Sequence, residues 1–364
     1  MISFGMTEDQ ELVRDTLREF AADQLRPIGR DCDEKSEIPA DFLQGCWDLG
    51  LTSTQIPEEY GGAGEERSPV TNAILLEELA HGDAALAIAA VAPSQFANAI
   101  VDHGTDAQKK QYLPLFCTEK YHAASLAIVE PDPLSDPFNP RTTAEPKGDG
   151  FVLSGTKSFV VMGDTASHFI VTARNGDSLD AFIVSKDASG LTISEREKNM
   201  GLRALSTVTI ELERVEVSAA DKLGGDDGAD VAAIISNSRA ALCAVQVGLS
   251  RAVLEFCVPY TKERVAFDEP IAKKQSIAFR LSEMHIGIES SRYLTWQAAS
   301  LLEHGEPAVR EARLAKTYVA ERSSWIADNG IQVFGGHGYI REYPVEMWFR
   351  HAKTLSVLEG ALGL

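Results

Sequence analysis

A long apolar seam in the last third of the chain restricts the fold more than any other feature of the sequence. Its residues recur at alternating steps of three and four, which is the spacing of a helix that packs along its whole length against other helices. The seam predicts a helix of roughly 30 residues, followed by helices near 271–303 and 307–333. Pro344 is suited to open a last helix that ends near residue 356, so a four-helix bundle is expected. The seam residues are Ile235, Ser238, Leu242, Val245, Leu249, Ala252 and Phe256.

The first two thirds of the chain change from a helical to a strand-like pattern near residue 119. Thr7 and Gln10 form a capping-box signature at the start of a helix. Further helices are expected over 71–80, 84–92 and 106–116. Short β-rich runs follow, and the last of them alternates apolar and polar residues as a half-buried strand does. These runs span 151–161, 168–172, 181–184 and 207–213.

The sequence therefore predicts a mostly α-helical protein with a central β domain. We expect an N-terminal helical domain over 1–118, a small β-barrel or sandwich domain over 119–225, and a C-terminal four-helix bundle over 226–364. We find no internal repeat and no low-complexity segment.

Charge and composition exclude several classes of partner. A net charge of −20 argues against nucleic acid, which needs clustered Lys and Arg. The longest apolar run, Ala84–Ala92, is nine residues, against the roughly 20 that span a bilayer, so no membrane span is expected. Met1–Gly5 lacks a secretory signal pattern. Five Cys residues without a C-x-x-C pattern fit a reducing cytoplasm.

Two motifs in the β-rich region resemble catalytic signatures, but neither meets the requirements of the signature it resembles. Gly150–Ser158 nearly matches the pattern of a phosphate-binding P-loop, but Thr156 is inserted before the Lys. The segment also continues as a strand, whereas a P-loop leads into a helix. Ser154 and Lys157 match a β-lactamase-type pair that has no companion motif. The chain has no G-x-S-x-G, H-E-x-x-H or G-x-G-x-x-G pattern, and no metal site is assigned.

Glu359, close to the end of the sequence, is the main candidate for a catalytic group. A carboxylate beside Val357, Leu358 and Leu362 is expected to be partly desolvated, which raises its pKa toward the range of a general base. Gly360 lets a substrate approach the backbone closely. The alternative is a solvated glutamate in a frayed C-terminal segment.

Two further features allow both a structural and a functional interpretation. Arg239 lies beside the apolar seam, where it is either an edge residue with a solvated head group or a charge directed at a ligand. Gly335 and Gly336 end the helix expected over 307–333. They are either its C-cap or a pair whose backbone N–H groups face a phosphate.

Taken together, several motifs in the same order resemble those of the acyl-CoA dehydrogenase family, over nearly the whole chain. Leu358-Glu-Gly360 is similar to the family's Y-E-G motif, which carries the catalytic base. The other matching segments are Ile56–Gly62, Leu153–Lys157, Asn199–Arg203 with Ser206–Thr207, Glu263–Phe267 with Gln275, Gln332–Tyr339, and Glu342–Glu346 with Arg350–Lys353.

The resemblance implies a tetrameric flavoenzyme, built as a dimer of dimers, with FAD between the β domain and the bundle. Residues expected to hold FAD within the same chain are Leu126, Ile128, Val129, Ser135, Phe159, Val161 and Ala361. Residues expected to reach the FAD of a neighbouring subunit are Arg264, Phe267, Gln275, Gln332 and Gly336, and Gly335 is a further expected cofactor contact. Substrate contacts are expected from Ser135, Ser238, Arg239, Leu358 and Gly360.

The resemblance also implies the chemistry. Glu359 would remove the α-proton of an acyl thioester while the β-hydride passes to flavin N5, and an electron-transferring flavoprotein would reoxidise the flavin. The ribityl hydroxyl of the flavin and the backbone N–H of Glu359 would polarise the thioester carbonyl. Some family members place the base one residue before the bundle arginine. Here that residue is Ser238, which favours Glu359.

The sequence departs from the family pattern at several flavin contacts. Val129, Val161 and Ala361 stand where hydroxyl-bearing residues are usual, and an unpaired flavin atom costs about 1–3 kcal/mol if it is buried. Asp268 replaces a glycine, Pro133 and Leu134 replace small residues in the substrate-side loop, and no helix follows the base within this sequence.

These departures leave four interpretations open. The first is a homotetrameric acyl-CoA dehydrogenase, and the second is one subunit of a heterotetramer that shares an FAD site. The third is a dehydrogenase of acyl groups held on a carrier protein, and the fourth is a flavin-free scaffold subunit, against which the retained Glu359 argues.

Overall fold

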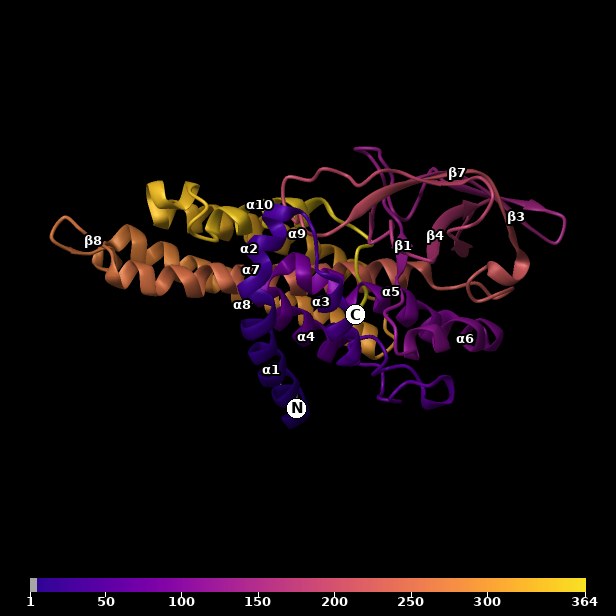
Figure 1. Cartoon of the computed structure of the whole chain (residues 1–364), viewed down its shortest axis with the longest axis horizontal. Coiled ribbons are helices and arrows are strands. Elements are labelled where there is room, and N and C mark those ends of the chain that lie inside the picture. Colours follow the sequence, from indigo (N-terminus) through magenta and orange to yellow (C-terminus); the bar gives the residue numbers. More distant parts are fainter. Residues whose placement is uncertain (1–4) are drawn as a thin grey trace.

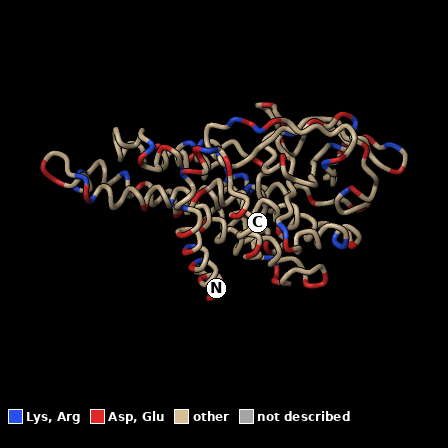
Figure 2. Tube along the Cα trace, viewed as in Figure 1, with Lys and Arg blue, Asp and Glu red and all other residues tan. Residues whose placement is uncertain are grey.

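The computed structural model describes residues 5–364; the predicted absence of a secretory signal in Met1–Gly5 concerns mainly residues 1–4, which lie outside the described part. The molecule is elongated, with helices at one end and in the centre and a sheet at the other end (Figure 1). Acidic and basic positions are interspersed along the whole trace, so the net charge is not confined to one domain (Figure 2).

The first third is helical, as the sequence predicts. The capping box at Thr7 and Gln10 is present at the start of the first helix. The π-helical turn Ala21–Leu25 joins the first two helices. The helices are α1 (Glu8–Phe20), α2 (Arg26–Lys35), α3 (Ala40–Asp48), α4 (Pro69–Gly82), α5 (Ala84–His103) and α6 (Asp106–Tyr112).

The central domain is one seven-stranded sheet, in the order β1-β4-β2-β3-β7-β6 with β5 paired to β4. Its long strands coincide with the predicted β-rich runs, whereas β1, β2 and β6, with three to five residues each, were not predicted. The strands are β1 (Ala124–Ala127), β2 (Thr143–Lys147), β3 (Gly150–Val161), β4 (His168–Asn175), β5 (Ser178–Ser185), β6 (Leu191–Ile193) and β7 (Thr207–Ser218).

The last third forms the predicted bundle around α7, which spans 33 residues. Most residues of the seam are buried, and α7 also packs on α4 so closely that a Cβ at Gly248 would lie 2.1 Å from the carbonyl oxygen of Glu77. The elements are α7 (Val231–Glu263), the short strands β8 (Val265–Ala266) and β9 (Glu269–Pro270), α8 (Gln275–Glu303), α9 (Val309–Phe334) and α10 (Val345–Val357).

Two helices, α5 and α7, are long and apolar enough to cross a membrane by length and composition alone. In the structure, 94% and 72% of their most apolar windows are buried inside the protein. Both therefore behave as core helices, which pass the same test of length and composition.

Candidate active site

Helix α10 delivers Glu359 to the edge of the sheet. The helix ends at Val357, Leu358 turns the chain into an extended conformation, and Gly360 follows with a φ of +64°. A Cβ at Gly360 would lie 2.7 Å from the Cβ of Ile128, just beyond β1. Only glycine combines this backbone conformation with so close an approach, so Gly360 fixes the position of the base against the β domain.

Arg239 of α7 binds the carboxylate of Glu359. Its Nε lies 3.1 Å from both Oε1 and Oε2 of Glu359. Its guanidinium carbon also lies 5.3 Å from the ring centre of Phe138, in the loop after β1. The alternative of a solvated edge residue is therefore wrong, because Arg239 is buried and directed at the candidate base.

Lys316 of α9 is a second cation near the base, and sequence reasoning missed it. Its side chain is 7% exposed, and its Nζ donates a hydrogen bond of 2.9 Å to the carbonyl of Leu355, in the last turn of α10. Burial lowers the pKa of Lys316, while the charge of Glu359 opposes that shift. A signal was present in the sequence, because Lys316 falls at helical spacing between the buried residues Ala312 and Val319.

The expected flavin wall comes from β1, β3 and the residues after them. Leu126, Ile128 and Val161 are buried, while Val129 and Phe159 are half-buried. The carbonyl of Val129 accepts a 2.9 Å hydrogen bond from the backbone N–H of the residue before Phe159, which joins the two segments. Phe159 has a left-handed φ of 52°, where the pairing of β3 with β7 becomes irregular. The structure thus brings these five predicted residues onto two adjoining segments.

Lys157, the lysine of the rejected P-loop, has a structural role in this wall. Its Nζ donates to the carbonyl of Ile128 at 3.1 Å and to Oε1 of Glu130 at 3.0 Å. Burial lowers the pKa of Lys157 to about 8, although the charge of Glu130 opposes the shift. The lysine therefore ties the flavin-wall segment to β3, which is consistent with rejecting the phosphate-binding interpretation.

The remaining predicted site residues differ in burial. Ser135 is half-buried in the loop after β1, and Ser238 is fully buried with no hydrogen-bond partner for its Oγ among the described residues. Leu358 and Ala361 are buried on either side of the Glu359–Gly360 pair. The expectation that Val357 desolvates the base is wrong: Val357 is 60% exposed, because it ends α10 on the solvent side.

The residues expected to serve a neighbouring subunit lie far from this wall. Phe267 is 89% exposed in the β8–β9 hairpin, which lies at the opposite end of the molecule from β1 and β3 (Figure 1). Gly335 caps α9 with a φ of 59°, as the C-cap interpretation predicts. A single chain therefore does not bring the two sets of predicted flavin contacts together. The other exposed members of the set are Arg264, Gln275, Gln332 and Gly336.

Comparison with known proteins identifies the family. The chain matches the family models of the acyl-CoA dehydrogenase N-terminal domain over residues 7–120, the middle domain over 125–215 and the C-terminal domain over 226–363. The chain belongs to the acyl-CoA dehydrogenase family. The family predicted from the sequence motifs is thus confirmed, as is the three-part architecture.

Members of the acyl-CoA dehydrogenase family resemble the chain over nearly its full length. The short/branched chain specific acyl-CoA dehydrogenase of Bos taurus mitochondria is 32% identical over 363 residues, which cover 97% of this chain and 83% of that protein. The structure of butyryl-CoA dehydrogenase from Megasphaera elsdenii is 30% identical with a TM-score of 0.88, covering 99% of this chain and 96% of the other. The FAD complex of PigA shares the fold, with a TM-score of 0.89, 23% identity and coverage of 99% and 96%.

Proposed function

We propose that the chain is an FAD-dependent dehydrogenase that introduces a double bond between the α and β carbons of an acyl thioester. The observation that carries the proposal is the position of Glu359, which α10 and Gly360 hold against Ile128 of the flavin wall. Family membership supports acyl-CoA as the general substrate class.

The residues present fit a flavin. The wall is apolar, and the hydroxyls of Ser158 and Ser206 beside it are buried without a hydrogen-bond partner among the described residues, so polar ring atoms would find donors there. Leu126, Val129 and Phe159 would hold the ring from the same chain. FAD supplies the two-electron acceptor when it is bound.

Glu359 has the role of general base in this proposal. In this role one of its carboxylate oxygens takes the α-proton, and its backbone N–H polarises the thioester carbonyl as negative charge develops there. Arg239 binds both oxygens of the carboxylate and restricts its orientation. The half-buried loop residue Phe138 packs on the guanidinium of Arg239 on the side of the β domain.

The proposal is tested with Glu359→Gln, which keeps the shape of the side chain and removes the base. We expect the rate of flavin bleaching by butyryl-CoA under anaerobic conditions to fall by about 10²–10⁴-fold, while the flavin content per chain stays the same. Glu145→Gln, in an exposed position of β2, is the matched control and should react normally. Retention of more than about a tenth of the rate in Glu359→Gln would refute the role of Glu359.

We further propose that the working form is an oligomer, with an electron-transferring flavoprotein as the oxidant of the reduced enzyme. The separation of the two sets of flavin contacts supports an oligomer, and so do exposed apolar residues on the hairpin and on α8, namely Phe267, Phe279 and Ile286. A homotetramer is the first candidate.

A heterotetramer with a shared FAD site is the second candidate, because Val129, Val161 and Ala361 lack the hydroxyls usual in the family. Absorbance of the chain purified alone distinguishes the two candidates. One flavin per chain supports the homotetramer, whereas a colourless protein that gains flavin only with a co-expressed relative supports the heterotetramer. A protein that stays colourless in both cases would favour the scaffold interpretation.

A further inference from the structure

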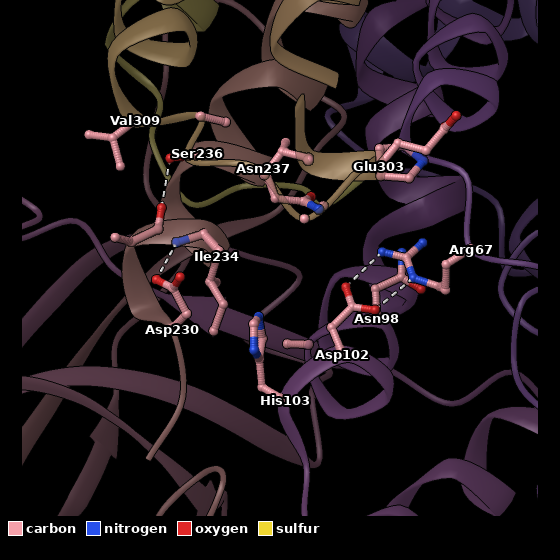
Figure 3. Close-up of a pocket in the computed structure, with 18 of the residues that line it drawn as sticks. Arg67, Asn98, Asp102, His103, Asp230, Ile234, Ser236, Asn237, Glu303 and Val309 are labelled. Atoms are coloured by element: carbon pink, nitrogen blue, oxygen red, sulfur yellow. Dashed lines mark hydrogen bonds and ion pairs between the residues drawn. The ribbon is translucent and has the colours of Figure 1, made fainter. Parts of the chain in front are cut away.

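A cavity of about 480 Å³ lies behind the segment that carries Glu359. It opens to solvent and is bounded by the end of α5, the start of α7 and the loop between α8 and α9 (Figure 3). Leu126 of β1 and Gly363 also line it, so the cavity adjoins both the flavin wall and the segment that follows the base. An acyl group that starts at Glu359 can therefore extend toward this space.

Carboxylates dominate the charge of the cavity wall. Asp102, Asp230, Glu303 and Glu306 line it, against one guanidinium, that of Arg67. The guanidinium of Arg67 already has partners within the chain. Its Nη2 lies 3.0 Å from Oδ2 of Asp102, as Figure 3 shows, and 2.7 Å from the carbonyl oxygen of Leu364.

The one histidine of the wall does not offset this negative charge. Burial lowers the pKa of His103, which leaves its ring neutral at pH 7. The cavity wall therefore carries more carboxylates than cations. Among the described residues, Asp230 and Glu303 accept hydrogen bonds from neutral donors only, the N–H of Ala233 and the groups of Ser68 and Val70.

Gln95 of α5 gives independent evidence that a ligand belongs here. The side chain lines the cavity and is 1% exposed, yet neither its Oε1 nor its Nε2 has a hydrogen-bond partner among the described residues. The nearby amides of Asn98 and Asn237 both bind the backbone of Leu364. A buried, unpaired amide is destabilising, so Gln95 is explained by a ligand that supplies its partner.

Two obvious occupants do not match this wall. An alkyl chain would leave Gln95 unpaired and would remove water from the carboxylates without compensation. The phosphate groups of coenzyme A would be repelled by Asp230, Glu303 and Glu306. An ammonium group matches the charge of the wall, and its N–H donors supply the partner that the Oε1 of Gln95 lacks.

We propose that the cavity receives the end of an acyl group that carries a protonated amine, so that the substrate is an aminoacyl thioester. The oxygen of Gln95 accepts a hydrogen bond from the ammonium, and Asp230 and Glu306 balance its charge. This inference rests on the proposed function, since it assumes that the thioester end of the substrate lies at Glu359.

The test compares acyl thioesters of equal size that differ only at the end of the chain. 3-Aminopropanoyl, 4-aminobutanoyl and 6-aminohexanoyl thioesters are paired with butanoyl, pentanoyl and heptanoyl thioesters, each on coenzyme A and on pantetheine. We expect at least one amine to exceed its methyl partner in kcat/KM by tenfold or more, on the same carrier. A methyl partner that is equal or better at all three lengths overturns the inference.

Two variants assign that preference to the cavity. Gln95→Leu and Glu306→Gln should each reduce the preference for the amine at least threefold, mainly through KM, because both remove a partner of the ammonium. Asp177→Asn, in the exposed turn between β4 and β5, is the matched control for loss of one negative charge and should leave the preference unchanged. A preference that survives both cavity variants also overturns the inference.

Binding without turnover separates this inference from the proposed function. In the Glu359→Gln background the substrate is not consumed, so calorimetry gives Kd for each pair directly. Tighter binding of the amine, lost on adding Gln95→Leu, supports the cavity assignment whether or not Glu359 is the base. If no thioester of either kind bleaches the flavin of the unmodified enzyme, the proposed function fails, while these Kd values still decide the cavity assignment.

Discussion

At the scale of single residues, the candidate base depends on two cations that belong to different helices. Arg239 of α7 contacts both carboxylate oxygens of Glu359, and Lys316 of α9 fixes the last turn of α10 through the carbonyl of Leu355. The first interaction orients the carboxylate and the second orients the segment that carries it.

Replacing Arg239 by Lys should lower turnover although the charge is kept. A lysine ammonium is a point charge and does not reproduce the geometry of Nε between two oxygens, so the carboxylate loses its fixed orientation. We expect kcat to fall by about 10–100-fold, with a smaller change in KM, measured by stopped-flow reduction of the flavin. Arg174→Lys, on the exposed side of β4, is the control. An unchanged kcat would contradict the assigned role.

Replacing Lys316 by Met should separate activity from stability. Methionine fills much of the same volume, and removing a buried charge is often neutral or stabilising, so we expect the Tm to stay the same or rise. Turnover should nevertheless fall about tenfold, because the end of α10 loses the donor that holds Leu355. Differential scanning calorimetry and steady-state kinetics on the same preparation test this pair of results. A parallel loss of Tm and turnover would indicate a purely structural lysine.

At the scale of elements, a buried network of charges joins α4 to α7, α8 and α1. Glu77 and Glu78 of α4 are buried and bind Arg251 of α7; Glu77 also binds Arg292 of α8, and Glu78 binds Arg18 of α1. Burial raises the pKa of Glu78, but hydrogen bonds from Arg251 and Arg18 outweigh it and hold the pKa below its usual 4.5.

This network should make the free energy of unfolding decrease as the pH falls into the acid range. Because the pKa of Glu78 is lower in the folded than in the unfolded state, its contribution is fully present above about pH 4.5 and is lost as the pH falls through the folded value. Glu78→Gln should cost about 3–5 kcal/mol at pH 7, since Arg251 loses a buried partner, and the difference from the unmodified protein should shrink toward pH 3. Urea unfolding at both pH values measures it, with the exposed Glu19→Gln as control. A difference independent of pH would contradict this explanation.

Long, periodic elements were predictable from the sequence, and short ones were not. The helix predicted over 271–303 is α8, Gln275–Glu303, because many turns of regular spacing define one buried face. Strand β1 has four residues, all buried, and pairs in parallel with β4, so nothing local in its sequence marks it as a strand.

The candidate site divides in the same way between predictable and unpredictable parts. Motifs identified Glu359 and the flavin wall because each lies in a contiguous signature. The contacts of Lys316 and Gln95 depend instead on which helices meet in space, and residue spacing along the chain does not contain that information.

At the scale of the whole molecule, the separation of the two sets of flavin contacts leads to a test by mixing subunits. Each complete site in our proposal combines the wall and Glu359 of one chain with Arg264 and the hairpin of another, which lies at the far end of the molecule (Figure 1). Arg264 is exposed, so Arg264→Glu should fold normally and impair only the site of its neighbour.

Co-expression of Glu359→Gln with Arg264→Glu should therefore restore activity that neither variant has alone. In a mixed pair, one site carries both substitutions and the other carries neither. Random assembly gives mixed pairs half of the time, so about a quarter of all sites should be active before purification, and about half of the sites in an isolated mixed pair. Two affinity tags isolate the mixed oligomers, and flavin content and turnover are measured on them. If both contacts instead served the FAD of their own chain, every site would carry one substitution, and the tagged oligomers would remain inactive.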